Sequence, residues 1–149
     1  MTRVLGLDIG ERRIGFAFGN VMSVGSSMVV PGGFLLIHHD ADALKQVTGL
    51  IEDEAPDTLV IGVPLRDGAE TKQSEKIRRL AGLIHEALPN MPMHFWDESL
   101  TSFSAGRALA SAELKHSGQS KKGRVDALAA SLIVQGFLDS RRGYAAGLG

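Results

Sequence analysis

Residues 58–63 form an almost uninterrupted apolar run, Thr-Leu-Val-Ile-Gly-Val, which constrains the fold more than any other segment. The run follows Pro56-Asp57 and stops at Pro64, and prolines commonly end regular structure. A short apolar run with such boundaries is typical of a strand that is buried on both faces, because helices cover both sides of the sheet. The run therefore predicts an α/β domain.

The other segments predict three strands, followed by strands that alternate with helices. Residues 3–9 and 13–19 indicate two strands joined by a tight turn at Gly10-Glu11-Arg12. A third extended segment is expected near residues 27–37, with a bulge or bend at Pro31-Gly32-Gly33. The later pattern predicts one helix that starts at Asp40 or Asp42, one that ends at Leu88, one that runs from Thr101 to about Leu114, and a last one that carries residues 125–137. It also predicts a buried strand at Met93–Trp96 and a polar, basic loop at Ser117–Gly123. This order predicts a mixed five-stranded sheet, with its first three strands antiparallel, flanked by helices.

Length and composition predict one domain over residues 1–140 and a flexible C-terminal tail over residues 141–149, which is rich in Gly and Ala. The chain has no cysteine, no leader pattern and no apolar run of about 20 residues, so we expect a cytoplasmic protein without a membrane span. Its formal net charge of −1 argues against a uniformly basic, non-specific nucleic-acid-binding surface.

Asp8 places a carboxylate in the middle of an apolar strand. Burying an isolated charge is unfavourable, so such a residue usually has a paired charge or a metal ion. Gly6 and Gly10 flank it, and glycine in a strand often marks the close approach of a ligand or another backbone. Asp8 is therefore the first candidate for chemistry.

Further carboxylates stand where a strand is expected to end, at Asp97-Glu98, and in the expected first turn of the last helix, at Asp126. Ligands of open α/β sheets bind beyond the carboxyl ends of the parallel strands, so Asp8 and Glu98 would converge if their strands are parallel. Asp126 would reach the same place from a helix packed on the sheet. Each position also has an ordinary explanation, a turn for Asp97 and Glu98 and a favourable helix-dipole position for Asp126.

Several carboxylates at one point repel one another unless a cation compensates their charge. Oxygen-only ligands favour Mg²⁺ or Mn²⁺. Two such ions, about 3.5–4 Å apart, would activate a water and stabilise the leaving oxygen of a phosphodiester.

Four motifs follow one another from residue 4 to about residue 138. They are Gly6-Leu-Asp8-Ile-Gly10 with Arg12-Arg13-Ile14-Gly15, Val60-Ile-Gly62-Val-Pro64-Leu with Asp67-Gly68, Trp96-Asp97-Glu98-Ser-Leu-Thr101, and Lys121-Lys122-Gly123-Arg124-Val125-Asp126-Ala-Leu-Ala-Ala130. In this order they resemble the YqgF family, also called RuvX, which is similar to Holliday-junction resolvases and has the RNase H-like fold. The resemblance implies a nuclease that processes the 5′ end of pre-16S ribosomal RNA. It implies catalytic and metal-ligand roles for Asp8, Glu98 and Asp126.

The chain also departs from the family pattern. Ser99 stands where the family usually has an arginine, which removes a contact to a phosphate or to an acid. The Asp67-Gly68 loop is about one residue short, and Asn20-Val21-Met22 replaces a more typical Ser-Asp-Pro turn.

Four basic residues near the expected site are candidates for phosphate contacts, with a solvated loop as the alternative for each: Arg12, Lys121, Lys122 and Arg124.

The partner implied by the resemblance is structured RNA, with branched DNA as an alternative, and the protein would be a monomer or a homodimer. A non-catalytic RNA-binding assembly factor and a nucleotide-binding fold of the actin and hexokinase kind are the other candidates. The second needs two such domains to enclose ATP, and one domain of 149 residues is too short for that.

Overall fold

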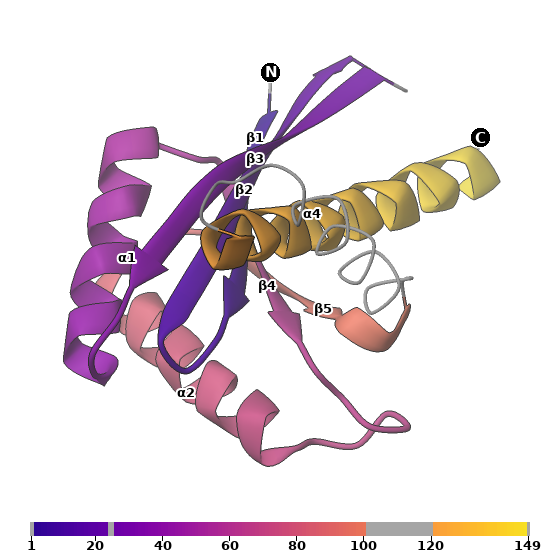
Figure 1. Cartoon of the computed structure of the whole chain (residues 1–149). Coiled ribbons are helices and arrows are strands. Elements are labelled where there is room, and N and C mark those ends of the chain that lie inside the picture. The colour runs from indigo at the N-terminus through magenta and orange to yellow at the C-terminus, as the bar shows by residue number, and fades with distance from the viewer. Residues whose placement is uncertain (1, 24–25, 101–120, 149) are drawn as a thin grey trace.

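The computed structural model describes residues 2–23, 26–100 and 121–148, which form a mixed five-stranded sheet with helices on both faces (Figure 1). The strands are β1 (Thr2–Ile9), β2 (Arg13–Ser23), β3 (Ser26–Leu36), β4 (Thr58–Val63) and β5 (Met93–Asp97), in the order β3-β2-β1-β4-β5. Neighbours among β1, β2 and β3 are antiparallel, whereas β4 runs parallel to both β1 and β5. The predicted fold class is confirmed.

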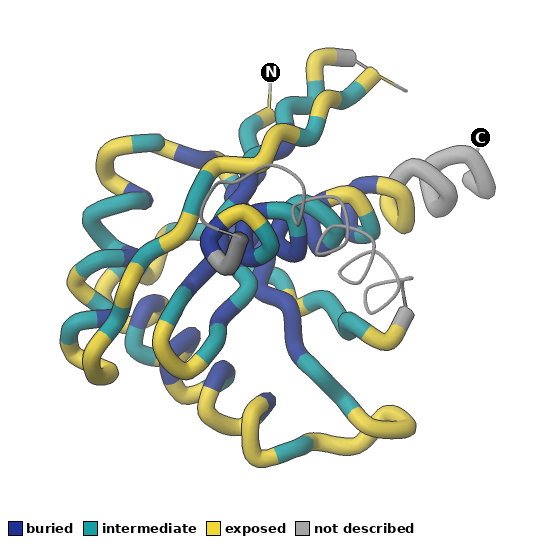
Figure 2. Tube along the Cα trace, in the orientation of Figure 1, coloured by how far each residue is buried: buried dark blue, intermediate teal, exposed yellow. Residues whose placement is uncertain are grey.

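Helices α1 (Asp40–Glu54) and α2 (Lys72–Ala87) cover one face of the sheet, and α4 (Lys121–Leu148) crosses the other (Figure 1). Strand β4 shows why both faces need a cover, because Leu59 and Ile61 join the core under α1 and α2 while Val60 joins the core under α4. The buried strand predicted at residues 58–63 is thus confirmed, and Figure 2 shows it as a continuous buried segment.

Helix α4 packs closely on the sheet because β1 and β2 present glycines to it. A Cβ added to Gly15 would lie 2.1 Å from the backbone oxygen of Asp126, and one added to Gly6 would lie 2.3 Å from Cγ2 of Val134. Real Cβ atoms do not come this near to other atoms, so a side chain at Gly15 would push the helix backbone away, and one at Gly6 would displace the side chain of Val134. The two glycines fix the height of α4, and with it Asp126, above the sheet.

The predicted irregularity in the third strand is confirmed. Phe16 pairs with Gly33 and the next residue, Ala17, pairs with Pro31, so Gly32 is the extra residue of a β-bulge. The start of α1 differs from the prediction, because His39 rather than Asp40 or Asp42 is the N-cap, and its ring Nδ1 accepts a hydrogen bond from the backbone N–H of Asp42 at 3.1 Å.

Two sequence predictions were wrong in detail. Residues 121–123 were predicted as part of a loop but belong to α4, which begins at Lys121, so Asp126 lies in the second turn of that helix and not in the first. Phe95 is not a core residue: β5 is the last strand of the sheet, and the Phe95 side chain is 41% exposed beneath the guanidinium of Arg78. Trp96 does pack against the α4 side of the core, as predicted.

The helix predicted at residues 101–114 lies outside the described residues. Helix α4 continues to Leu148 through the segment for which a tail was predicted, and the domain boundary at residue 140 stays a prediction. No described helix combines the length and the apolar character that a bilayer crossing requires.

Candidate active site

The carboxyl ends of the three parallel strands bring two of the predicted carboxylates to one edge of the sheet. Leu7 of β1 is opposite Ile61 of β4, and Gly62 is opposite Trp96 of β5. Asp8 therefore follows the last paired position of β1 next to Gly62. Glu98 begins a short 3-10 helix, η1 (Glu98–Leu100), directly after β5.

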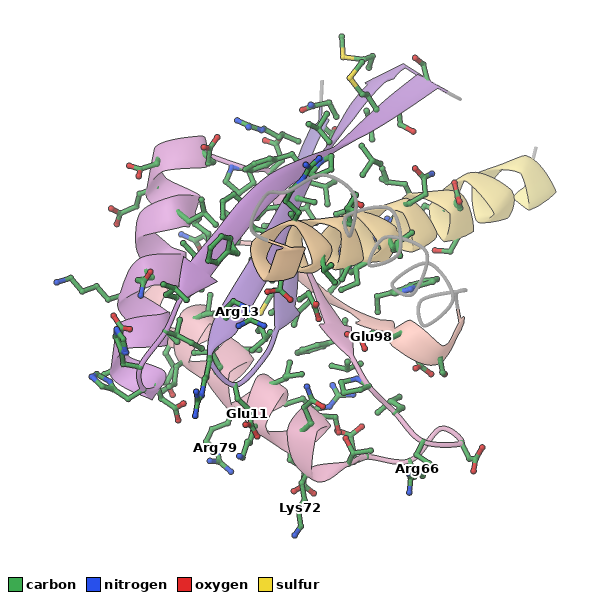
Figure 3. The ribbon with its side chains drawn as sticks, in the orientation of Figure 1. Glu11, Arg13, Arg66, Lys72, Arg79 and Glu98 are labelled. Carbon is green, nitrogen blue, oxygen red and sulfur yellow. The ribbon has the colours of Figure 1, made fainter. Side chains whose placement is uncertain are left out.

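Glu98 reaches back over β4 on the side that α4 covers. A Cβ on Gly62 would lie 2.8 Å from Oε1 of Glu98 and 2.4 Å from Cδ1 of Ile133, a residue of α4. The carboxylate thus occupies space that the missing side chain of Gly62 leaves open. Figure 3 shows Glu98 near the end of β4, on the side of the molecule where α4 lies.

Asp126 comes to the same face from α4. Asp8 pairs with Gly15 across β1 and β2, and the backbone of Asp126 lies against Gly15. Asp8 and Asp126 line one pocket of about 350 Å³, together with residues of the β1–β2 turn and Gln73. The structure therefore brings Asp8 and Asp126 together and places Glu98 on the same face of the sheet, beyond Gly62.

The buried charge of Asp126 is compensated by an arginine. The Asp126 residue is 5% exposed, and Nε of Arg13 donates a hydrogen bond of 2.6 Å to its Oδ2. A buried carboxylate needs such a partner, because the desolvation of an unpaired charge is strongly unfavourable. In this conformation Arg13 holds one of the oxygens that a cation would need.

The three carboxylates offer oxygen donors only, which suits Mg²⁺ or Mn²⁺. In the described part of the chain, no three His, Cys, Asp or Glu side chains gather closely enough to hold a metal ion. The residues suit a divalent cation by donor type and by their common face, while Arg13 occupies Oδ2 of Asp126.

Asp97 and Glu98 differ in their surroundings. Oδ1 of Asp97 accepts hydrogen bonds from the backbone N–H of Ser99 at 3.0 Å and from its hydroxyl at 2.7 Å. Asp97 therefore shapes the turn after β5, whereas Glu98 lies over Gly62. Ser99, which replaces the family arginine, is part of this turn.

The basic residues predicted to contact substrate lie at different positions. Arg12 is exposed and lines the pocket of Asp8 and Asp126. Arg124 is exposed on α4. The backbones of Lys121 and Lys122 form the start of α4, and their side chains lie outside the described part of the structure.

Arg13 is the site residue that the sequence reasoning missed. Alternate residues of a strand point to the same side, so Arg13 and Gly15 share the α4 face of β2. The sequence offered one signal for Arg13: it stands two residues before Gly15, a glycine that leaves room for a helix. Its partner, however, is 113 residues away along the chain.

The chain is similar to known proteins along most of its length. The family model described as "RuvX: Holliday junction resolvase" matches residues 2–140. A Clostridium botulinum protein named "Putative pre-16S rRNA nuclease" is 37% identical over 141 residues, covering 93% of this chain and 97% of that protein. A Chloroflexus aurantiacus protein of the same name is 34% identical over 140 residues, covering 93% of this chain and 88% of its own length.

A solved structure shares the fold. Thermus thermophilus RuvC in complex with a Holliday junction substrate superposes with a TM-score of 0.57 at 14% identity, covering 89% of this chain and 92% of RuvC. The family match and the named relatives confirm the prediction of an enzyme of the nuclease class. The chain belongs to the RuvX family, a family of nucleases, and has the RNase H-like fold.

Proposed function

We propose that this chain is a divalent-metal-dependent nuclease that hydrolyses phosphodiester bonds in the precursor of 16S ribosomal RNA. The observation that carries the proposal is the position of Asp126, a buried carboxylate that α4 holds over the Asp8–Gly15 pair. The names of the relatives support the RNA substrate. The lack of cysteine supports a cytoplasmic setting.

Rigid elements hold the three carboxylates. Asp8 stands at the end of β1, which has a strand on either side, and Glu98 follows the parallel strand β5. Asp126 is held by the contact of α4 with Gly15. We assign Asp8, Glu98 and Asp126 as the ligands of one or two Mg²⁺ or Mn²⁺ ions. When bound, such ions supply an activated water and stabilise the charge on the leaving oxygen.

Arg13 has two tasks in this proposal. Without a cation it neutralises Asp126, and the same ion pair must open before Oδ2 of Asp126 can act as a ligand. The released guanidinium lies in the pocket that Asp8 and Arg12 also line, where its planar donors suit a phosphate. Arg12, Lys121, Lys122 and Arg124 add further positive charge around the carboxylates for the substrate backbone.

Cleavage of a pre-16S RNA leader in Mg²⁺ or Mn²⁺ tests the proposal. Asp126→Asn and Asp8→Asn should lower the cleavage rate by more than about 100-fold, beyond what residues that only orient metal ligands contribute. Asp139→Asn is the matched control on α4, because Asp139 is exposed and bonds only to Gln135 among the described contacts. Wild-type activity in folded Asp126→Asn would contradict the proposal.

A second candidate substrate is branched DNA, because the family model carries the description of a Holliday junction resolvase. A four-way DNA junction and the RNA leader should be compared at equal concentrations in the same metal. Preferential cleavage of the junction would replace the RNA proposal. Binding of RNA that survives EDTA, without cleavage in any metal, would identify a non-catalytic RNA-binding factor instead.

A further inference from the structure

Helix α2 carries a stripe of three cations that the proposed chemistry does not use. Lys72, Lys76 and Arg79 are spaced four and three residues apart, so they lie on one face of the helix. All three are exposed, and none of them forms an ion pair or a hydrogen bond with another described residue. Their neighbour Arg78 differs, because Glu70 pairs with it. We call Lys72, Lys76 and Arg79 the α2 stripe.

The α2 stripe borders a pocket of about 770 Å³, which we call the α2 groove. Its opposite wall consists of the β1–β2 turn at Gly10 and Glu11 and the start of α1 at Asp40. Two carboxylates therefore face three cations across the groove, and the positive charge is concentrated on the α2 side. Glu75 of α2 is exposed but does not line the groove, so the charged residues with which α2 lines it are all cations.

The α2 groove adjoins the candidate active site. The two pockets share Ile9, Gly10, Glu11 and Gln73, so only the β1–β2 turn separates them. Figure 3 shows Arg13, Glu11 and Arg79 following one another down the molecule, with Lys72 at the lower end of α2. An extended chain that occupies the pocket of Asp8 and Asp126 can therefore pass the turn and continue along α2.

The length of the α2 stripe suits a nucleic-acid strand. Seven residues separate Lys72 from Arg79, which corresponds to about 10.5 Å along a helix. Consecutive phosphates of an extended strand lie farther apart than the rise of about 3.4 Å per nucleotide along a duplex axis, so the stripe spans at most about three phosphates. Three unpaired cations with this spacing complement a run of consecutive phosphates.

We propose that the α2 groove binds the phosphates of the substrate strand that flank the cleaved bond, with Lys72, Lys76 and Arg79 as positioning residues. The assignment of this strand as the cleaved one rests on the proposed function. The stripe adds affinity and fixes the register of the strand, while the carboxylates on the other side of the turn act on the bond. Phosphate contacts of this kind carry no base preference.

The experiment measures binding of RNA in EDTA, so that no cleavage takes place. Two fluorescent RNA probes contain the same hairpin. The long probe carries a single-stranded extension of about 12 nucleotides, and the short probe carries one of about 3 nucleotides. The long extension can cross the β1–β2 turn and lie along α2, whereas the short one ends before the stripe. The triple variant Lys72→Gln/Lys76→Gln/Arg79→Gln is titrated against both probes at several salt concentrations.

The triple variant should bind the long probe at least about tenfold more weakly. The slope of log K against log salt should fall by about 2, from three contacts at about 0.7 each on a single strand. The affinity for the short probe should stay unchanged. Lys76→Gln alone should show part of the effect, and Lys45→Gln, an exposed lysine of α1 outside the groove, should show none.

An unchanged affinity and salt slope for the long probe would overturn the inference. Equal losses for the two probes would also overturn it, since they would indicate a general effect of net charge. Far-UV circular dichroism and the melting temperature of each variant confirm that it is folded. Failure of the wild type to cleave RNA in any metal contradicts the proposed function alone, because the binding results do not depend on cleavage.

Discussion

The two faces of the sheet are covered in different ways. Under α1 and α2 the strands present large aliphatic side chains that are fully buried, among them Leu5, Leu7, Leu59 and Ile61. Under α4 they present mainly small residues, including Gly6, Gly15, Ala17 and Gly19. The first face gains stability from buried apolar area. On the second face the small residues allow a helix and its carboxylate to come close to β1.

The buried polar groups follow the same division. Among the described residues, Ser74 and Asp126 are the buried polar or charged ones. Ser74 belongs to α2, where it completes a capping box with Thr71 and therefore serves the helix itself. Asp126 pairs with Arg13 of β2, and its backbone lies against Gly15 of the same strand. The comparison indicates that one face stabilises the domain and the other positions the candidate catalytic carboxylates.

The largest effect is expected from truncation on the α1 and α2 face. Leu59→Ala removes a fully buried side chain and should lower the free energy of unfolding by about 2–5 kcal/mol. The folded fraction should still cleave RNA at close to the wild-type rate, since Leu59 points away from α4. Urea unfolding and an assay of the purified folded protein measure the two quantities. A large loss of activity in the folded protein would break the division between the faces.

On the α4 face, addition of a methyl group should damage both stability and chemistry. Gly15→Ala would place its Cβ 2.1 Å from the backbone of Asp126, so α4 has to move. We expect a loss of about 3 kcal/mol, at the upper end for overpacking, together with a loss of cleavage. Gly82→Ala in α2 is the control, since nothing lies within 4 Å of its Cβ, and it should stabilise the helix by about 1 kcal/mol. Similar stabilities of the two variants would contradict the close packing of α4.

Removal of the arginine partner of Asp126 should have a smaller effect. Arg13→Gln leaves the buried carboxylate without its cation, and because the Arg13 side chain is 31% exposed we expect a loss of about 1–2 kcal/mol. A divalent cation can then replace the lost charge. Mg²⁺ should therefore raise the melting temperature of Arg13→Gln more than that of the wild type. An equal shift in both proteins would indicate that the ion does not bind at Asp126.

The smallest effect concerns pH and His94, which contacts α4 from β5. Burial lowers the pKa of His94, and the nearby charge of Arg141 lowers it further. The unfolded chain then binds a proton more readily than the folded protein, so stability falls as pH drops below about 6.5, the ordinary value for histidine. His94→Gln should flatten this part of the stability curve between pH 5 and 7. A steeper loss of stability in the variant would refute this assignment.

Much of the fold could be predicted because its signals are local. The apolar run at residues 58–63, the turn at Gly10–Arg12 and the bulge at Gly32 each depend on neighbouring residues. The exposure of Phe95 could not be predicted from neighbouring residues, because the order of the strands makes β5 an edge strand. The apolar sequence of β5 would suit a central strand equally well.

The candidate site was predictable in part. Asp8 became a candidate because it is a charge in an apolar strand, and Glu98 and Asp126 because of their expected positions and the family resemblance. The ion pair of Arg13 with Asp126 was missed because it joins residues from opposite ends of the chain. The start of α4 was placed too late because Lys121–Gly123 contains a glycine and two charges, a composition that also suits a loop.

Titration of the protein with Mn²⁺, followed by calorimetry or electron paramagnetic resonance, tests most directly whether Asp8, Glu98 and Asp126 form one metal site. The wild type should bind the ion, and Asp8→Asn, Glu98→Gln and Asp126→Asn should each weaken binding by at least about tenfold, while Asp139→Asn should not. If all three variants bound Mn²⁺ as tightly as the wild type, the three carboxylates would not be its ligands.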